Sequence, residues 1–191
     1  CSLKFISKPI NNLSNNIPFK YNYNFFECII NTIFSLILNK ITNSVIVDVD
    51  KLEQISNKKN ILLVSSHRSY MDFMIICKIC LKYRCYGLKF PYSFATYKFK
   101  NSYLISKVMS LLNTLFIDDN NLKNVIESKS KNNNVYQLFL EGTRSRERLF
   151  LKPHIGILNN LLENMDLTIV PITINYEKIP DDFNSKITFS G

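Results

Sequence analysis

The chain has 191 residues, a length that suits one domain with a single hydrophobic core. Hydrophobic residues make up 46% of it and charged residues 20%, which is typical of an ordered globular protein and argues against a disordered one. The formal net charge of +9 favours an anionic partner, either nucleic acid, an acidic membrane surface or a phosphorylated small molecule. Charge alone does not choose among these classes.

Residues 1–22 carry Asn, Pro and Ser without periodicity and predict an irregular lead-in. Apolar residues then recur at helical spacing over residues 25–41, which predicts an amphipathic helix. This run falls short of the roughly 20 residues that a membrane span needs. The helix could lie on a membrane surface, but packing against the domain is the favoured interpretation.

We expect residues 1–43 to form the lead-in and the N-terminal amphipathic helix, and residues 44–191 to form the main domain. The chain begins at Cys1 without an initiator methionine and ends directly after an apolar run. It is therefore expected to be a fragment of a longer protein.

Short apolar runs alternate with helical segments in the rest of the chain. The expected strands are 45–49, 61–64, 114–117, 135–140 and 167–174, and the expected helices are 70–83, 102–112 and 122–129. Such an alternation predicts an α/β fold with a mostly parallel sheet flanked by helices.

The five cysteines show no spacing that suggests a disulfide framework, which indicates a reducing compartment. Cys77 and Cys80 form a Cys-x-x-Cys pair, but no second pair completes a zinc site. We expect both to be small buried hydrophobic side chains of a helix and expect no metal.

The first polar segment that could carry chemistry follows the strand predicted at 61–64 and precedes a helix, where α/β proteins place ligands. It contains His67 and Asp72. The two can meet only if His67 lies in the turn before the helix and Asp72 in its first turn. A carboxylate bonded to one imidazole nitrogen would leave the other free to accept a proton. Alternatively, or in addition, Ser69 caps the helix and Asp72 is its partner in a capping box.

The second polar segment follows the strand predicted at 135–140 and reads Glu141-Gly142-Thr143-Arg144-Ser145-Arg146. If both strands are parallel, the two segments lie at the same edge of the sheet and face one crevice. Gly142 permits a sharp turn, while Arg144 and Ser145 offer a guanidinium group and a hydroxyl suited to phosphate. The competing interpretation is a solvated basic turn in which Glu141 pairs with an arginine.

The segments HRSYMD, LEGTRSR and VPITINYEKI, in this order, resemble the signatures of the glycerolipid acyltransferase superfamily. These signatures are His-x-x-x-x-Asp, a Glu-Gly-Thr-Arg-Ser block and a Val-Pro block, and the match covers roughly residues 61–179. The HRSY segment with its following Asp-Phe, and the segment KPHIGIL at 152–158, look more like the glycerol-3-phosphate and dihydroxyacetone-phosphate acyltransferases than like the lysophosphatidate enzymes.

The resemblance implies that His67 is the general base and that Asp72 orients it. It implies a set of residues that bind the phosphorylated acceptor, namely Arg68, Ser69, Glu141, Gly142, Thr143, Arg144 and Ser145. The donor would be acyl-CoA or an acyl carrier protein, the acceptor a phosphorylated glycerol-type molecule, and no cofactor would be needed. Membrane lipid would be a further partner, with the domain at an organelle membrane such as the endoplasmic reticulum.

One departure from the family concerns its second block, which usually ends in Ile followed by Asp-Arg or Arg-Arg. Here residues 115–119 read LFIDD, so Asp119 stands where an arginine is expected, and its carboxylate would repel phosphate. Either Lys98, Arg68 or Arg146 supplies the missing charge, or this copy has diverged.

Two alternatives to the glycerol-3-phosphate type follow: a lysophosphatidate acyltransferase, and a non-catalytic domain of the same fold that binds phospholipid at a membrane surface. Nucleic acid is not an expected partner, because the basic residues are scattered and no nucleic-acid-binding signature is present.

Overall fold

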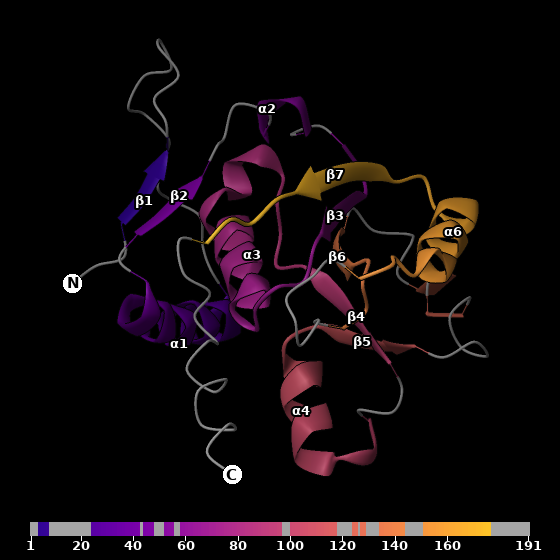
Figure 1. The fold of residues 1–191 in the computed structure, drawn as a ribbon, viewed down its shortest axis with the longest axis horizontal. Helices are drawn as coiled ribbons and strands as arrows, with labels where there is room; N and C mark the ends of the chain where they lie inside the picture. The colour runs from indigo at the N-terminus through magenta and orange to yellow at the C-terminus, as the bar shows by residue number, and fades with distance from the viewer. Residues whose placement is uncertain are drawn as a thin grey trace. The chain divides into compact units, whose positions relative to one another are not determined.

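A computed structural model of the chain describes residues 4–7, 24–42, 44–47, 52–55, 58–96, 100–117, 124–125, 127–128, 134–143 and 151–176 (Figure 1). The chain forms two compact units. The helical unit comprises Cys1–Asn57, Ser69–Leu88 and Glu177–Gly191, and the sheet unit comprises Lys58–Arg68 and Lys89–Tyr176.

The sheet unit is built on five parallel strands (Figure 1). In the order in which they lie side by side, they are β5 (Thr114–Ile117), β4 (Tyr92–Thr96), β6 (Val135–Phe139), β3 (Ile61–Ser65) and β7 (Thr168–Ile172). The unit also contains helices α4 (Tyr103–Leu111) and α6 (Ile155–Asn164). The predicted α/β fold with a parallel sheet is confirmed.

The core of the sheet unit lies on one face of this sheet, where side chains two positions apart point the same way. Its buried members are Leu62, Ile117, Tyr136, Leu138, Leu161 and Met165. On the other face of the central strands, Leu63 and Gln137 are also buried. Burial on both faces explains why β3 was recognisable as a continuous apolar run, whereas β6 has one polar residue, Gln137, in its run.

Asn60 fastens the start of the central strands. Its backbone carbonyl accepts from Thr168 N at 2.8 Å, and its side-chain oxygen accepts from Asn134 N at 3.2 Å. The backbone of Ile61 in turn donates to the Asn134 carbonyl at 3.0 Å. These bonds fix the parallel register of β3 with both neighbours. The C-terminal ends of β3, β6 and β7 therefore lie side by side at one edge of the sheet.

The helical unit contains α1 (Phe25–Ile41), α2 (Leu52–Ile55), α3 (Met71–Lys82) and the short 3-10 helix η1 (Arg84–Tyr86). It also holds a two-stranded parallel sheet of β1 (Lys4–Ser7) and β2 (Ser44–Val47). The helices predicted at 25–41 and 70–83 are confirmed. No described helix is long and apolar enough to cross a membrane.

Several predictions of local structure need correction. The lead-in is not irregular throughout, because residues 4–7 pair with β2, and the strand predicted at 45–49 joins this small sheet instead of the main one. Strand β4 was missed because Ser93 and Ala95 interrupt its apolar pattern, and α6 was missed as well. The predicted boundary between residues 43 and 44 stays a prediction.

Cys77 and Cys80 are fully buried on α3, as the sequence predicted. Burial raises the pKa of the Cys77 thiol well above its ordinary value and that of Cys80 to about 12. Both side chains therefore stay protonated and behave as apolar groups.

Candidate active site

The two polar segments leave neighbouring strands of the sheet unit at the same level. Strands β3 and β6 are parallel, and Ser65 at the end of one is the partner of Phe139 at the end of the other. His67 and Glu141 each follow two residues later. The predicted meeting of these two segments at one edge of the sheet is confirmed.

Glu141 ties the segments together through both oxygens of its buried carboxylate. Oε1 accepts a hydrogen bond from the backbone nitrogen of His67 at 3.3 Å, and Oε2 accepts one from the backbone nitrogen of Leu151 at 3.1 Å. The residue is only 6% exposed, so these bonds compensate the cost of burying its charge. The same carboxylate therefore holds the backbone of the predicted base and the segment before α6.

Gly142 makes the sharp turn that the sequence predicted. Its φ of +64° lies in the left-handed region, and its nitrogen donates to the Phe139 carbonyl at 3.0 Å, which closes the turn. A Cβ at this position would lie 3.4 Å from Cδ2 of the His154 ring. His154 is itself fixed along the turn, since its nitrogen donates to the Leu140 carbonyl at 2.7 Å. Thr143 follows on the exposed side of the turn.

The imidazole of His67 stacks on the ring of Phe139, with centroids 4.1 Å apart and 22° between the ring planes. Stacking involves the face of an imidazole ring, whereas the nitrogens of an imidazole form hydrogen bonds in the ring plane. The half-buried His67 is thus oriented by its backbone bond to Glu141 and by its ring contact with Phe139. An imidazole held in one orientation suits a general base.

In the helical unit, Ser69 and Asp72 form only one half of the capping box predicted for the start of α3, because Tyr70 is the N-cap residue, without a side-chain cap bond, and Asp72 N donates to the Ser69 backbone carbonyl. The Asp72 carboxylate accepts from Ser69 N at 2.8 Å, and the Ser69 hydroxyl accepts from Met71 N at 3.0 Å. Both residues are fully buried. Asp72 lies in the first turn of α3 and His67 precedes the helix, as their pairing would require. The pairing itself stays a prediction.

Two predicted acceptor-binding residues, Arg144 and Ser145, lie outside the described residues, as do Arg146, Lys98 and Asp119. Arg68 is half-buried and is the last residue of the segment Lys58–Arg68, which belongs to the sheet unit. Sequence reasoning missed the roles of Phe139 and Leu151, because neither residue type marks a site and one contributes only its backbone. Among the described residues there is no cluster of His, Cys, Asp or Glu that could hold a metal ion.

Comparison of the chain with known proteins identifies its family. The Acyltransferase family matches residues 46–175, a stretch that includes both strand ends and the turn at Gly142. The chain therefore belongs to the acyltransferase family, as its motifs had indicated.

Among the relatives, the chain is 28% identical over 174 residues to a dihydroxyacetone phosphate acyltransferase from Mus musculus, covering 83% of this chain and 25% of that protein. It is 29% identical over 150 residues to the protein of that name from Homo sapiens, covering 70% and 22%. A glycerol-3-phosphate acyltransferase from Xylella fastidiosa is 29% identical over 175 residues, covering 83% and 20%. The chain thus spans a quarter or less of the length of these relatives.

Proposed function

We propose that this protein transfers a fatty acyl group from acyl-CoA, or from an acyl carrier protein, to the hydroxyl of glycerol 3-phosphate or dihydroxyacetone phosphate. Family membership supports acyl transfer, and the names of the relatives support this acceptor class. The observation that carries the proposal is the hydrogen bond by which Glu141 joins the His67 backbone to the Gly142 turn. It brings the predicted base and the predicted acceptor-binding loop to one edge of the sheet.

In the proposed reaction, a ring nitrogen of His67 takes the proton of the acceptor hydroxyl while that oxygen attacks the thioester carbonyl carbon. A carbon–oxygen bond forms and the carbon–sulfur bond breaks. The carrier leaves as a thiolate, which takes up the proton. No acyl-enzyme is needed, because binding both substrates in the right geometry lowers the barrier to direct transfer.

The acceptor phosphate would be held by Arg144, Ser145 and the backbone of Gly142, as the family resemblance implies. Placing the phosphate there would present the hydroxyl to His67. The orienting role of Asp72 and contributions from Arg68, Ser69 and Thr143 belong to the same proposal. Backbone N–H groups at a helix start could stabilise the oxyanion of the transition state.

We further propose that the protein works at a membrane surface, with this domain in a reducing compartment. Fatty acyl chains and their glycerolipid products partition into bilayers, and the cysteines of the described part of the chain are free thiols. A second proposal is a domain of the same fold that binds phospholipid without turnover. It is favoured by Asp119, which stands where the family has an arginine.

The chain has two histidines, and they offer a matched test of the base. His67→Ala and His154→Ala are compared with wild type for release of free thiol from palmitoyl-CoA, with circular dichroism confirming the fold. Glycerol 3-phosphate, dihydroxyacetone phosphate and lysophosphatidate are supplied in parallel. A general base of this kind contributes about 10²–10⁴-fold, so His67→Ala should lose at least about 100-fold in kcat.

His154→Ala should keep most of the activity. Full activity of folded His67→Ala would contradict the assignment of the base. Product formed with lysophosphatidate alone would show that the proposed acceptor class is wrong. Phospholipid binding without product from any acceptor would favour the non-catalytic domain.

A further inference from the structure

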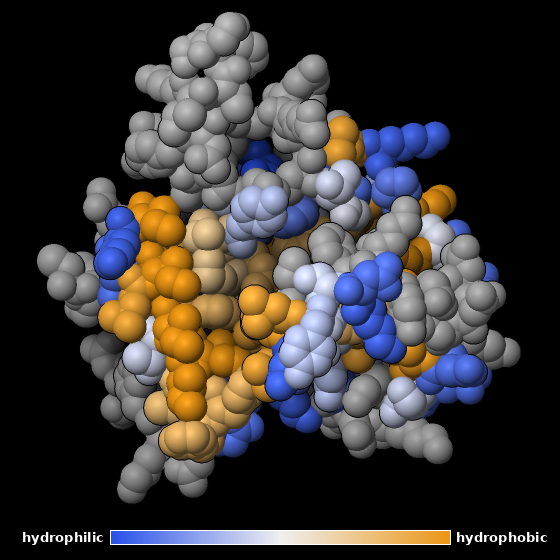
Figure 2. Space-filling view, turned by 90° about the horizontal axis from the view of Figure 1, so that it is seen from below, coloured by the Kyte–Doolittle hydropathy of each residue, from blue (hydrophilic) through white to orange (hydrophobic). Residues whose placement is uncertain are grey.

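Helix α1 carries apolar side chains on two sides. Ile30, Phe34 and Leu38 are buried within the helical unit, where the Phe34 ring packs edge-on against Phe73 of α3 with centroids 6.1 Å apart. The other side, which we call the outer face of α1, exposes seven large apolar side chains. They are Phe25, Phe26, Ile29, Ile33, Leu36, Ile37 and Ile41. Figure 2 shows a band of hydrophobic side chains over this helix.

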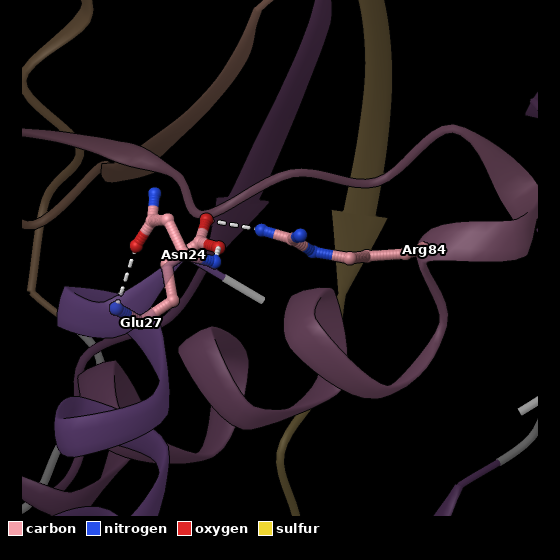
Figure 3. A network of polar contacts seen from close by, with 3 residues as sticks. All are labelled: Asn24, Glu27 and Arg84. Carbon is pink, nitrogen blue, oxygen red and sulfur yellow. Dashed lines mark hydrogen bonds and ion pairs between the residues drawn. The ribbon is translucent and has the colours of Figure 1, made fainter. Parts of the chain in front are cut away.

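Polar contacts between α1 and the rest of the helical unit fix the rotation of the helix about its axis and so keep the outer face exposed. At the start of the helix, Asn24 and Glu27 form a reciprocal capping box, and the Glu27 carboxylate pairs with Arg84 (Figure 3). Further along, the buried amine of Lys78 donates to Asn31 Oδ1 at 2.7 Å and to Ser35 Oγ at 2.6 Å. Turning α1 over would break these bonds and expose its buried side chains, so the exposure of the outer face is built into the unit.

Two features of the exposed part of α1 suit an apolar surrounding. The hydroxyl of the exposed Thr32 donates to the Cys28 carbonyl one turn earlier at 2.9 Å, so the helix satisfies it internally. The one acidic residue of the helix, Glu27, is on the inner side, and the charged group left exposed is Lys40 in the last turn. The outer face therefore combines apolar area with a cation and no carboxylate.

We infer that the outer face of α1 docks onto the surface of a lipid bilayer that carries anionic headgroups. The helix is about 25 Å long and its inner face is occupied by its own unit, so it would lie in the plane of the interface with Phe25, Ile29, Ile33 and Leu36 among the acyl chains. Lys40 would lie at headgroup level. Lys40 follows Leu36 by four residues and Ile37 by three, so it stands at the C-terminal end of this same face, where its long side chain can reach the headgroups.

Charge favours a bilayer over a second copy of this chain as the occupant. The chain carries a formal net charge of +9, so two copies repel each other, whereas an anionic membrane attracts each of them. This inference rests on the exposure and charge of α1 and does not require acyl transfer to occur.

The test is flotation of the full chain with vesicles of phosphatidylcholine containing phosphatidylglycerol, without acyl donor or acceptor. Ile33→Gln/Leu36→Gln removes two outer-face side chains that are 47% and 61% exposed. The matched control, Ile155→Gln/Leu162→Gln on α6, removes two that are 54% and 44% exposed. Glutamine keeps the charge and favours helix, so both variants should fold.

We expect the vesicle partition coefficient to fall at least about tenfold for the α1 variant, because two half-exposed aliphatic groups lose their transfer into lipid. The α6 control should bind as the wild type does. The inference is overturned if the α1 variant binds as tightly as wild type, if wild type does not float with the vesicles, or if the variant instead dissociates a dimer seen by light scattering. Equal binding to pure phosphatidylcholine would overturn the requirement for anionic lipid. A failure of the protein to bind vesicles would not contradict the acyl-transfer proposal, because thiol release from palmitoyl-CoA is measured separately.

Discussion

Replacing Glu141 by glutamine tests whether this residue positions the predicted base or binds the acceptor. Both carboxylate oxygens accept backbone hydrogen bonds, at 3.3 Å from His67 N and 3.1 Å from Leu151 N. Glutamine retains one acceptor oxygen and places an NH₂ group against the other backbone N–H. A hydrogen bond to a charged group contributes about 1.5–3 kcal/mol, and the long distances here favour the lower end.

We therefore expect Glu141→Gln to lower the free energy of unfolding by about 1.5–2 kcal/mol. In a protein of this size the midpoint of thermal unfolding should fall by about 3–8 °C. The matched control is Glu163→Gln, which changes an exposed glutamate of α6 in the same way. A surface change of this kind should shift the free energy of unfolding by less than about 0.5 kcal/mol.

Enzyme kinetics separate the two roles of Glu141. If the carboxylate positions His67, kcat falls about tenfold or more while KM for the phosphorylated acceptor changes little. If it contacts the acceptor, as the family resemblance implies, KM for the acceptor changes and stability does not. A thermal midpoint equal to that of Glu163→Gln, together with unchanged kcat, would refute the positioning role.

Two further predictions concern the turn and the helical unit. Gly142→Ala should lower the free energy of unfolding by about 1 kcal/mol or more, because the φ of +64° is strained for a residue with a Cβ. Urea unfolding measures this change, and an unchanged midpoint would contradict the left-handed turn. Burial, and then the charge of Lys82, lowers the pKa of Lys78 below its ordinary 10.5. Between that lowered pKa and 10.5, the folded state binds fewer protons than the unfolded state, so the free energy of unfolding rises with pH. Lys78→Gln should remove this part of the rise in unfolding free energy as the pH approaches 10.5, whereas Lys40→Gln, at an exposed position, should keep it. Equal slopes in the two variants would refute the assignment.

Local patterns in the sequence predicted the elements whose apolar residues recur regularly. The helices at Phe25–Ile41 and Met71–Lys82 and the strands β3, β5 and β6 form where the spacing of apolar residues indicates them. The left-handed turn at Gly142 also followed from residue type, because glycine adopts a positive φ without strain. Elements with mixed patterns, such as β4 with Ser93 and Ala95, did not.

The candidate site divides in the same way. Its motifs were visible in the sequence, and the hydrogen bond from Ser69 N to the Asp72 carboxylate is local, since the two residues are three positions apart. The role of Glu141 was not visible, because the backbone nitrogen that it binds belongs to a residue 74 positions away and only strand pairing brings the two together. The ring of Phe139 beneath His67 has the same origin.

The sequence by itself determined that this is an acyltransferase-like α/β chain with an apolar N-terminal helix, since motif order and hydrophobic period are properties of the linear chain. Tertiary structure alone decided which partners the strands take and which side of α1 is buried. A helix that is apolar on two sides gives no local sign of which side packs, and the choice is made by Phe73, Lys78 and Arg84, which lie far along the chain.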